Sequence, residues 1–376
     1  MKKYLLFLPL AGLLLTGCGG NNKDDESVPV GPGLPAGGTE VDLKDQEKVT
    51  KAANKLADDI KISYASAMNG FEVRGSFKAD EFSIVEQGFA LKAINLGYNF
   101  EIKANNIGEK LSDYQFSVVV SNFSGQFVIN EAIPAAKKIF EASNVSFGIY
   151  LYESVVYADF SNPAFKVLAK SVINYAVPAE KLDAVNTVVD PLFNKVKLVN
   201  LISDLGLKDE KMIPDVSEEM FAEMKTEIVE GARAIVEDEK SPVGIIDYDE
   251  NALGIIIQTG NSEERMGENE GGNYSYKESL LLTGDVYFDK YGNLNKINLN
   301  EVIDNENKEN GVVNEKLKIS ASESITFSLG TGNFEKPNFE EFADSNFINV
   351  LMEIIQSSDN KITIVGAEDH NVMIAD

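Results

Sequence analysis

The chain has 376 residues, with 60 acidic and 34 basic side chains and a formal net charge of −26 at pH 7. A surface this acidic repels nucleic acid and anionic lipid headgroups, so we expect neither to bind through the general surface. Cys18 is the single cysteine, which excludes disulfides within the chain and a metal centre built from several cysteines.

The chain begins with a pattern typical of a secretory signal. Lys2 and Lys3 precede an apolar run from Tyr4 to Leu15, and small residues follow up to Cys18. A helix that crosses a membrane needs about 20 apolar residues, so this run is too short. We therefore predict that residues 1–17 are removed. Because they carry two lysines and no acid, the remaining 359 residues have a formal charge of −28.

The residues before the cysteine carry a more specific pattern. Leu15, Thr16, Gly17 and Cys18 resemble the lipobox of bacterial lipoproteins, a branched apolar residue and two small or hydroxyl residues before an invariant cysteine. The resemblance implies cleavage before Cys18 by signal peptidase II and a lipid on its sulfur. It places the protein outside the cytoplasm, anchored to the cell membrane or outer surface of a bacterium. An ordinary signal peptide with an incidental cysteine is the alternative.

Composition divides the rest of the chain. Residues 18–41 are rich in Gly, Pro, Asn and acids, which predicts a disordered tether. Within it, Lys23-Asp24-Asp25-Glu26 resembles the acidic export signal of surface lipoproteins in Bacteroidota; a solubilising charge cluster is the alternative. Beyond the tether we predict two similar halves, each made of helices and antiparallel strands, at residues 42–176 and 215–357. A helical connection joins them at residues 177–214, and a C-terminal tail follows at residues 358–376.

The first half begins with an amphipathic helix over residues 45–67. Alternating apolar and polar side chains then predict strands at residues 71–77, 94–102, 116–120, 127–129, 145–151 and 155–160. A helix follows and ends near Tyr175. A second helix is predicted to carry Leu192, Val196 and Val199 on one side.

The second half repeats this order. A helix around Met220 precedes strands at residues 244–248, 253–258, 279–288, 293–302, 316–320 and 324–329, and a last helix carries apolar residues from Phe347 to Ile355. The clearest hairpin turn is at residues 289–293, where Gly292 supplies a positive φ. Residues 263–273 are predicted to form a long mobile loop.

The two halves share one short motif. Phe-x-x-Pro-x-Phe begins at Phe160 and again at Phe334, an offset of 174 residues. A proline ends a strand and suits the first turn of a helix, so both copies predict strand-to-helix corners. A tandem duplication is one explanation, and chance similarity is the other.

Few residues suggest chemistry. His370 is the single histidine and has no companion ligand or nucleophile nearby in sequence, and Ser358 to Lys361 match a Ser-x-x-Lys spacing only where a helix ends. Stretches beginning at Asp247 and Asp304 resemble calcium loops but lack required ligands, so we interpret both as solvated acidic loops. We predict no catalytic residue, metal site or cofactor, and an enzyme is the less favoured class.

The predicted fold is α+β, with an extensive curved antiparallel sheet and helices packed on one face. Its element order over residues 42–357, with the lipoprotein signal, resembles the lipid-handling lipoproteins of the LolA and LppX type. The resemblance implies a membrane-anchored binding module for an apolar, lipid-like ligand, whose other partner is the membrane reached through Cys18. A structural or protein-interaction lipoprotein of the envelope without a ligand pocket remains open, with a hydrolase third.

The lipid anchor has a direct test. Cys18→Ala should leave the precursor uncleaved at this position and without lipid, since no other cysteine can replace the thiol. Metabolic labelling with a radioactive fatty acid measures the modification. Label that persists in the variant would contradict the anchor.

Overall fold

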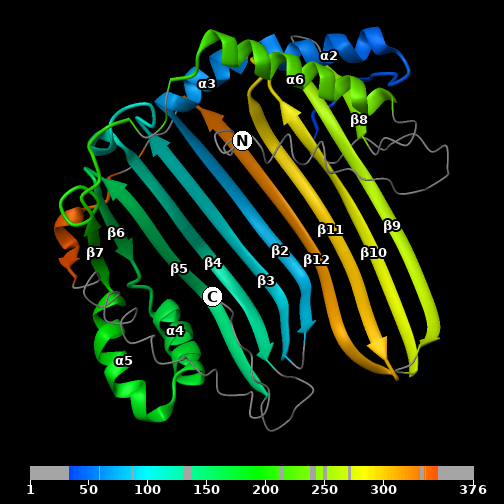
Figure 1. Ribbon diagram of the computed structural model, residues 1–376. Helices are drawn as coiled ribbons and strands as arrows, with labels where there is room; N and C mark the ends of the chain where they lie inside the picture. The colour runs from blue at the N-terminus through cyan, green and yellow to red at the C-terminus, as the bar shows by residue number, and fades with distance from the viewer. Residues whose placement is uncertain are drawn as a thin grey trace. The chain divides into compact units, whose positions relative to one another are not determined.

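The computed structural model describes residues 34–58, 60–86, 89–129, 137–211, 213, 215–237, 243–248, 252–269, 272–330, 334 and 336–345. They form a mixed α+β fold dominated by antiparallel strands, which confirms the predicted class (Figure 1). The chain divides into two compact units, Met1–Phe89 with Ile213–Gly332, and Ala90–Met212 with Asn333–Asp376.

The first unit contains seven described strands, paired antiparallel in the order β1, β8, β9, β10, β11, β12, β2. Their bounds are β1 (Thr39–Glu40), β2 (Gly70–Glu86), β8 (Val243–Asp247), β9 (Leu253–Asn269), β10 (Gly272–Phe288), β11 (Leu294–Glu309) and β12 (Val312–Leu329). The described helices of this unit are α2 (Gln46–Asp58), α3 (Ile60–Asn69) and α6 (Glu218–Glu237).

Several of these strands are longer than predicted. The loop predicted over residues 263–273 is wrong, because β9 runs on to Asn269 and β10 begins at Gly272. The acidic stretch from Asp304 is also not a loop. It lies on β11 and β12, which join through a tight turn at Asn310 (φ 51°) and Gly311 (φ 79°). Polar side chains on both faces of a strand remove the alternation from which strands are predicted.

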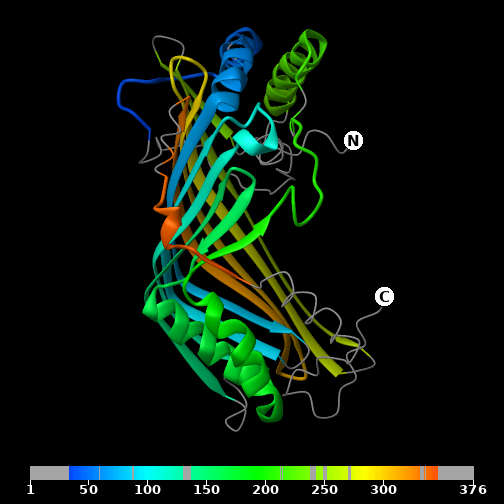
Figure 2. The same ribbon diagram turned by 90° about the vertical axis from the view of Figure 1, so that its left-hand side faces the viewer.

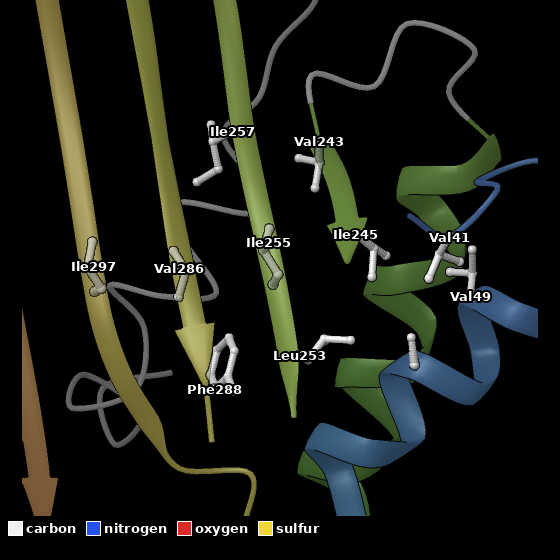
Figure 3. Packing of buried hydrophobic residues seen from close by; sticks show 11 residues of the cluster. Val41, Val49, Val243, Ile245, Leu253, Ile255, Ile257, Val286, Phe288 and Ile297 are labelled. Carbon is white, nitrogen blue, oxygen red and sulfur yellow. The ribbon is translucent and has the colours of Figure 1, made fainter. Parts of the chain in front are cut away.

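The core of the first unit lies where α2 meets the sheet. Helix α2 buries one face that carries Val49, Ala52, Ala53 and Ala57, and it packs against α6. Figure 3 shows the apolar side chains of β8, β9, β10 and β11 that complete this cluster: Val243, Ile245, Leu253, Ile255, Ile257, Val286, Phe288 and Ile297. The predicted first helix and the helix around Met220 therefore meet in one core.

Residues 34–41, which composition places in the tether, lie against the β8 edge. The Val41 N–H donates to the Ile245 carbonyl at 2.8 Å, and the Tyr248 hydroxyl donates to the Pro35 carbonyl at 2.9 Å. A Cβ atom at Gly38 would lie 2.3 Å from the Ile246 side chain, so glycine is required for this close approach. The chain is thus held from Pro35 onward.

The second unit contains six described strands in the order β3, β4, β5, β6, β7, β13, and only the β13–β7 pair among them is parallel. The strands are β3 (Phe89–Asn105), β4 (Gln115–Ile129), β5 (Lys138–Tyr152), β6 (Val155–Asp159), β7 (Lys195–Asn200) and β13 (Ala343–Asp344). The helices are α4 (Pro163–Ala176) and α5 (Leu182–Val189), with short 3₁₀ turns at Leu111–Asp113, Ala179–Lys181, Asp190–Leu192 and Phe339–Glu341. Figure 2 shows α4 and α5 from the side.

The helix predicted to carry Val196 and Val199 is wrong, because both residues lie on β7. They are nevertheless both buried, since the pairing of β6 with β7 shifts between Val156 and Tyr157 and places an extra residue on β7. A bulge therefore produced the three-residue apolar spacing that resembled a helix.

Both Phe-x-x-Pro-x-Phe corners belong to the second unit. At the first, the Asn162 side chain accepts a hydrogen bond from the Phe165 N–H at 2.9 Å, and Pro163 occupies the first turn of α4. At the second, Phe339 begins a 3₁₀ turn and its ring stacks on Tyr157 with centroids 4.0 Å apart. The duplication that the motif suggested stays a prediction.

The core of the first unit predicts a large difference between two leucines. Leu253 is 2 % exposed, so Leu253→Ala should cost about 2–5 kcal/mol of unfolding free energy through lost burial and a cavity. Leu281→Ala is the matched control, because Leu281 is 45 % exposed. Urea unfolding measures both. Equal losses would contradict the placement of the core.

Candidate functional site

The long strands of the first unit sort their side chains onto two unlike faces. On one face, Leu280, Ile303, Ile319 and Phe82 are successive register partners across β10, β11, β12 and β2. We call this side of the first unit's sheet its apolar face. All four side chains are half-buried. This row crosses the middle of the long strands, whereas helices α2, α3 and α6 gather at the end where β2 begins (Figure 1).

A bulge in β2 maintains this face. Ser320 pairs with Glu81 and the next residue, Ala321, pairs with Ala79, so Asp80 is an extra residue on β2. Phe77 before the bulge and Phe82 after it therefore point to the same side. Without the extra residue, the alternation of the strand would turn Phe82 away.

The opposite side, which we call the charged face, carries cross-strand ion pairs. Lys277 on β10 pairs with Asp304 on β11 at 2.5 Å, and Lys318 on β12 pairs with Glu81 on β2 at 2.6 Å. The hydrogen bond from Lys277 lowers the pKa of Asp304, and the hydrogen bond to Glu81 raises the pKa of Lys318. This face is therefore suited to water or polar partners.

The acidic stretches that resemble calcium loops do not form a calcium site among the described residues, because several of their carboxylates are bound by lysines. Asp304 and Glu306 are engaged by lysines, Asn310 lies in the turn, and Glu315 lies on the apolar side of β12. These oxygens do not converge. Asp247 pairs with Lys55, whereas its partners Asp249 and Asn251 lie outside the described residues. Within the described ranges, no group of three or more His, Cys, Asp or Glu side chains could hold a metal ion.

Glu323 is one of the acidic residues on the apolar face, which also carries Glu301 and Glu315. Its register partners are Leu299 on β11 and Phe77 on β2, and burial raises the pKa of its carboxyl group. A carboxyl group that is neutral at higher pH can donate a hydrogen bond. Among the acidic residues of this face, Glu323 has a raised pKa and would be suited to donate a hydrogen bond to a ligand headgroup.

The second unit has the same two-sided character. Ile102, Val118, Ile149, Ala158 and Val196 are register partners from β3 to β7 and form its apolar face. Ile149 is 37 % exposed. Apolar residues therefore lie side by side across five strands.

The other face of the second unit carries aromatic rings. Tyr157 stacks on Phe339, and Tyr150 lies edge-on to the same ring at 6.3 Å. The Lys336 ammonium lies 4.4 Å from the Tyr152 ring centroid, within the range of a cation–π contact. Burial raises the pKa of both Tyr150 and Tyr157. The segment from Phe334 to Ser345 thus covers this face.

Two hollows lie at strand ends. One of about 560 Å³ lies at the hairpin turns of the first unit, beside Tyr274 and Lys308. The other, of about 360 Å³, lies in the second unit and is lined by polar groups that include Asn106, Asp113 and Gln115. Neither is an apolar pocket between sheet and helices of the kind that the lipid-carrier resemblance implies.

Cys18, His370 and the stretch from Ser358 to Lys361 lie outside the described residues, as does the last predicted helix. Compared with known proteins, the chain matches no family model and no curated protein sequence. Of the helices in the described parts of the chain, none combines the length and apolar character needed to cross a membrane.

Sequence patterns missed the two faces because cross-strand partners are set by register. Apolar residues at alternating positions, such as Leu280 and Leu282 on β10 or Ile297 and Leu299 on β11, were visible in the sequence, but which residues meet across strands was not. The opposite charges of Lys277 and Asp304 are visible in the sequence, but they are 27 residues apart and their pairing depends on the register of β10 with β11.

Glu323 gives a pH-dependent prediction. Its folded pKa lies above its ordinary value of 4.5, so the unfolded state loses the proton first and the protein loses stability as the pH rises from 4.5 to the folded pKa. Glu323→Gln removes this loss. The variant should gain stability relative to the natural protein at neutral pH, and the gain should vanish at about pH 4.

Urea unfolding at the two pH values measures this difference. Glu315→Gln on the same strand is the control, since Glu315 is exposed and should show no such gain. A gain for Glu323→Gln that is equal at both pH values would argue against a perturbed carboxyl group.

Proposed function

We propose that this chain is an extracytoplasmic bacterial lipoprotein, anchored through a lipid on Cys18, that binds an apolar, lipid-like ligand on the apolar face of its sheet. The row formed by Leu280, Ile303, Ile319 and Phe82 carries the proposal. As part of this proposal, and following the resemblance to the LolA and LppX type, the sheet is strongly curved and the helices pack on one of its faces.

Physical chemistry supports an apolar ligand here. Removing apolar surface from water is favourable by roughly 25 cal/mol per Å², and the row presents four large apolar side chains that are not fully buried. An acyl chain laid across the strands would contact several of them at once. Glu323, with its raised pKa, lies on the same face and could donate to a polar headgroup.

The main alternative is an envelope lipoprotein that acts through protein contacts and has no ligand pocket. One observation favours it: both hollows lie at strand ends and not between sheet and helices. In that case the apolar rows serve packing alone.

Two adjacent residues of β11 separate these functions. Ile303 lies on the apolar face and Val302 on the charged face, where it is 42 % exposed. Ile303→Glu should weaken binding of the fluorescent fatty acid cis-parinaric acid by about tenfold or more, because an unpaired carboxylate would be buried beside the acyl chain. Val302→Glu should leave binding unchanged. Fluorescence titration of the full chain measures both.

Circular dichroism must show that the variants fold, and Ile303→Ser provides a milder change at the same position. Native mass spectrometry of protein purified from its own host should also reveal a bound lipid mass. If the natural chain binds no fatty acid and no non-covalently bound lipid is found, the ligand proposal is wrong and the protein-contact function replaces it.

A further inference from the structure

Strand β9 is longer than the strand that lies beside its outer edge. β10 pairs with β9 over its full length, whereas β8 pairs with it only from Leu253 to Ile257. From Gln258 to Gly267, no described strand of the first unit lies on the side away from β10 (Figure 1). More than half of this 17-residue strand thus presents one edge of its backbone.

Burial changes at the point where β8 ends. Every residue from 252 to 257 is buried, whereas Gln258 and all residues from 261 to 266 are exposed. Side chains of a strand alternate between faces, so six consecutive exposed residues mean that both faces are open here. Within the part of the chain that the structure describes, a partner strand can therefore approach this edge without displacing a covering element.

The chain closes its shorter edges itself. In the first unit β1 caps β8 through the pairs Thr39 with Asp247 and Glu40 with Ile246. In the second unit β13 caps β7. Proteins commonly close edge strands, because unpaired N–H and C=O groups invite another strand. The much longer β9 edge is left without such a cap among the described residues.

We propose that the β9 edge, residues 258–267, binds an extended basic segment of a partner protein, which joins the sheet as an added strand. Backbone hydrogen bonds would supply affinity, as in other strand additions. Glu263 and Glu264 are exposed on the edge, and Glu278 is the register partner of Glu263 on β10. Arg265 is bound to Glu263 at 2.5 Å. Glu264 lies opposite Lys277 on β10, whose ammonium is bound to Asp304, so the Glu264 carboxylate has no hydrogen-bonded ion pair of its own with Lys277 and can attract a basic residue of the partner.

A second copy of the chain fits this edge poorly. Antiparallel pairing of two β9 edges would bring the acidic pair Glu263 and Glu264 of one copy beside that of the other, and like charges directly opposite are destabilising. The formal charge of −26 opposes association of two copies as well. This inference does not rest on the apolar ligand proposed above.

The test uses the full chain and a fluorescein-labelled peptide of alternating Lys and Val. Fluorescence anisotropy should show binding, and amide hydrogen exchange should slow in residues 258–267 when the peptide is added. A peptide of the same charge with a central Pro in place of Val should not bind, because proline interrupts the backbone ladder. The double variant Glu263→Lys, Glu264→Lys should weaken binding about tenfold or more.

The matched control is Glu223→Lys with Glu227→Lys on α6, which changes the net charge equally at an exposed site and should leave binding unchanged. Equal binding of the Pro-containing peptide, or equal weakening by the control, would reduce the effect to general electrostatic attraction and overturn the proposal. So would absent peptide binding, or exchange protection confined to other strands. A dimer seen in sedimentation, with slowed amide exchange in residues 258–267 at the protein concentration where the dimer forms, would assign the edge to a second copy instead.

Discussion

The register between β9, β10, β11, β12 and β2 is the constraint on which the first unit depends. Val286 lies between Ile255 and Ile297 because each pair is directly opposite, and every further row follows from that alignment. Slipping one strand by a single residue would exchange its apolar and polar sides. The core beside α2 and the ion pairs of the charged face therefore depend on the same register, and the extra residue Asp80 keeps β2 in phase with both.

Helix starts and turns could be predicted from the sequence, because a few adjacent residues determine them. The proline of the first motif, Pro163, lies in the first turn of α4, as its fixed φ predicts, and the turn before β11 contains Gly292 with a φ of 70°. The predicted α+β class with antiparallel strands follows from such signals. Where distant partners decide, the signals failed: the bulge in β7 imitated a helix, and the polar end of β9 imitated a loop. The faces of the sheet depend on the same distant pairings.

The described surfaces of the first unit differ in the kind of contact they offer. On the charged face, Lys277 and Lys318 are already paired with acids, so a partner that binds these two lysines would have to displace existing ion pairs. The apolar face offers hydrophobic contact area but few oriented hydrogen bonds. The β9 edge offers regularly spaced backbone hydrogen-bonding groups but little apolar area. Because the three surfaces make different kinds of interaction, we expect them to bind different molecules.

The contact of residues 35–41 with the β8 edge has a mechanical consequence if the chain is anchored at its amino terminus. A force pulling the body away from a membrane would reach the Tyr248–Pro35 hydrogen bond and the β1–β8 pair first, and the core beside α2 only afterwards. Two short strands separate under less force than a packed helix. Releasing about six residues at roughly 3.4 Å each would extend the leash by some 20 Å while the fold stayed intact. Under such a force, residues 35–41 would thus detach from β8 and lengthen the connection to the membrane before the core unfolds.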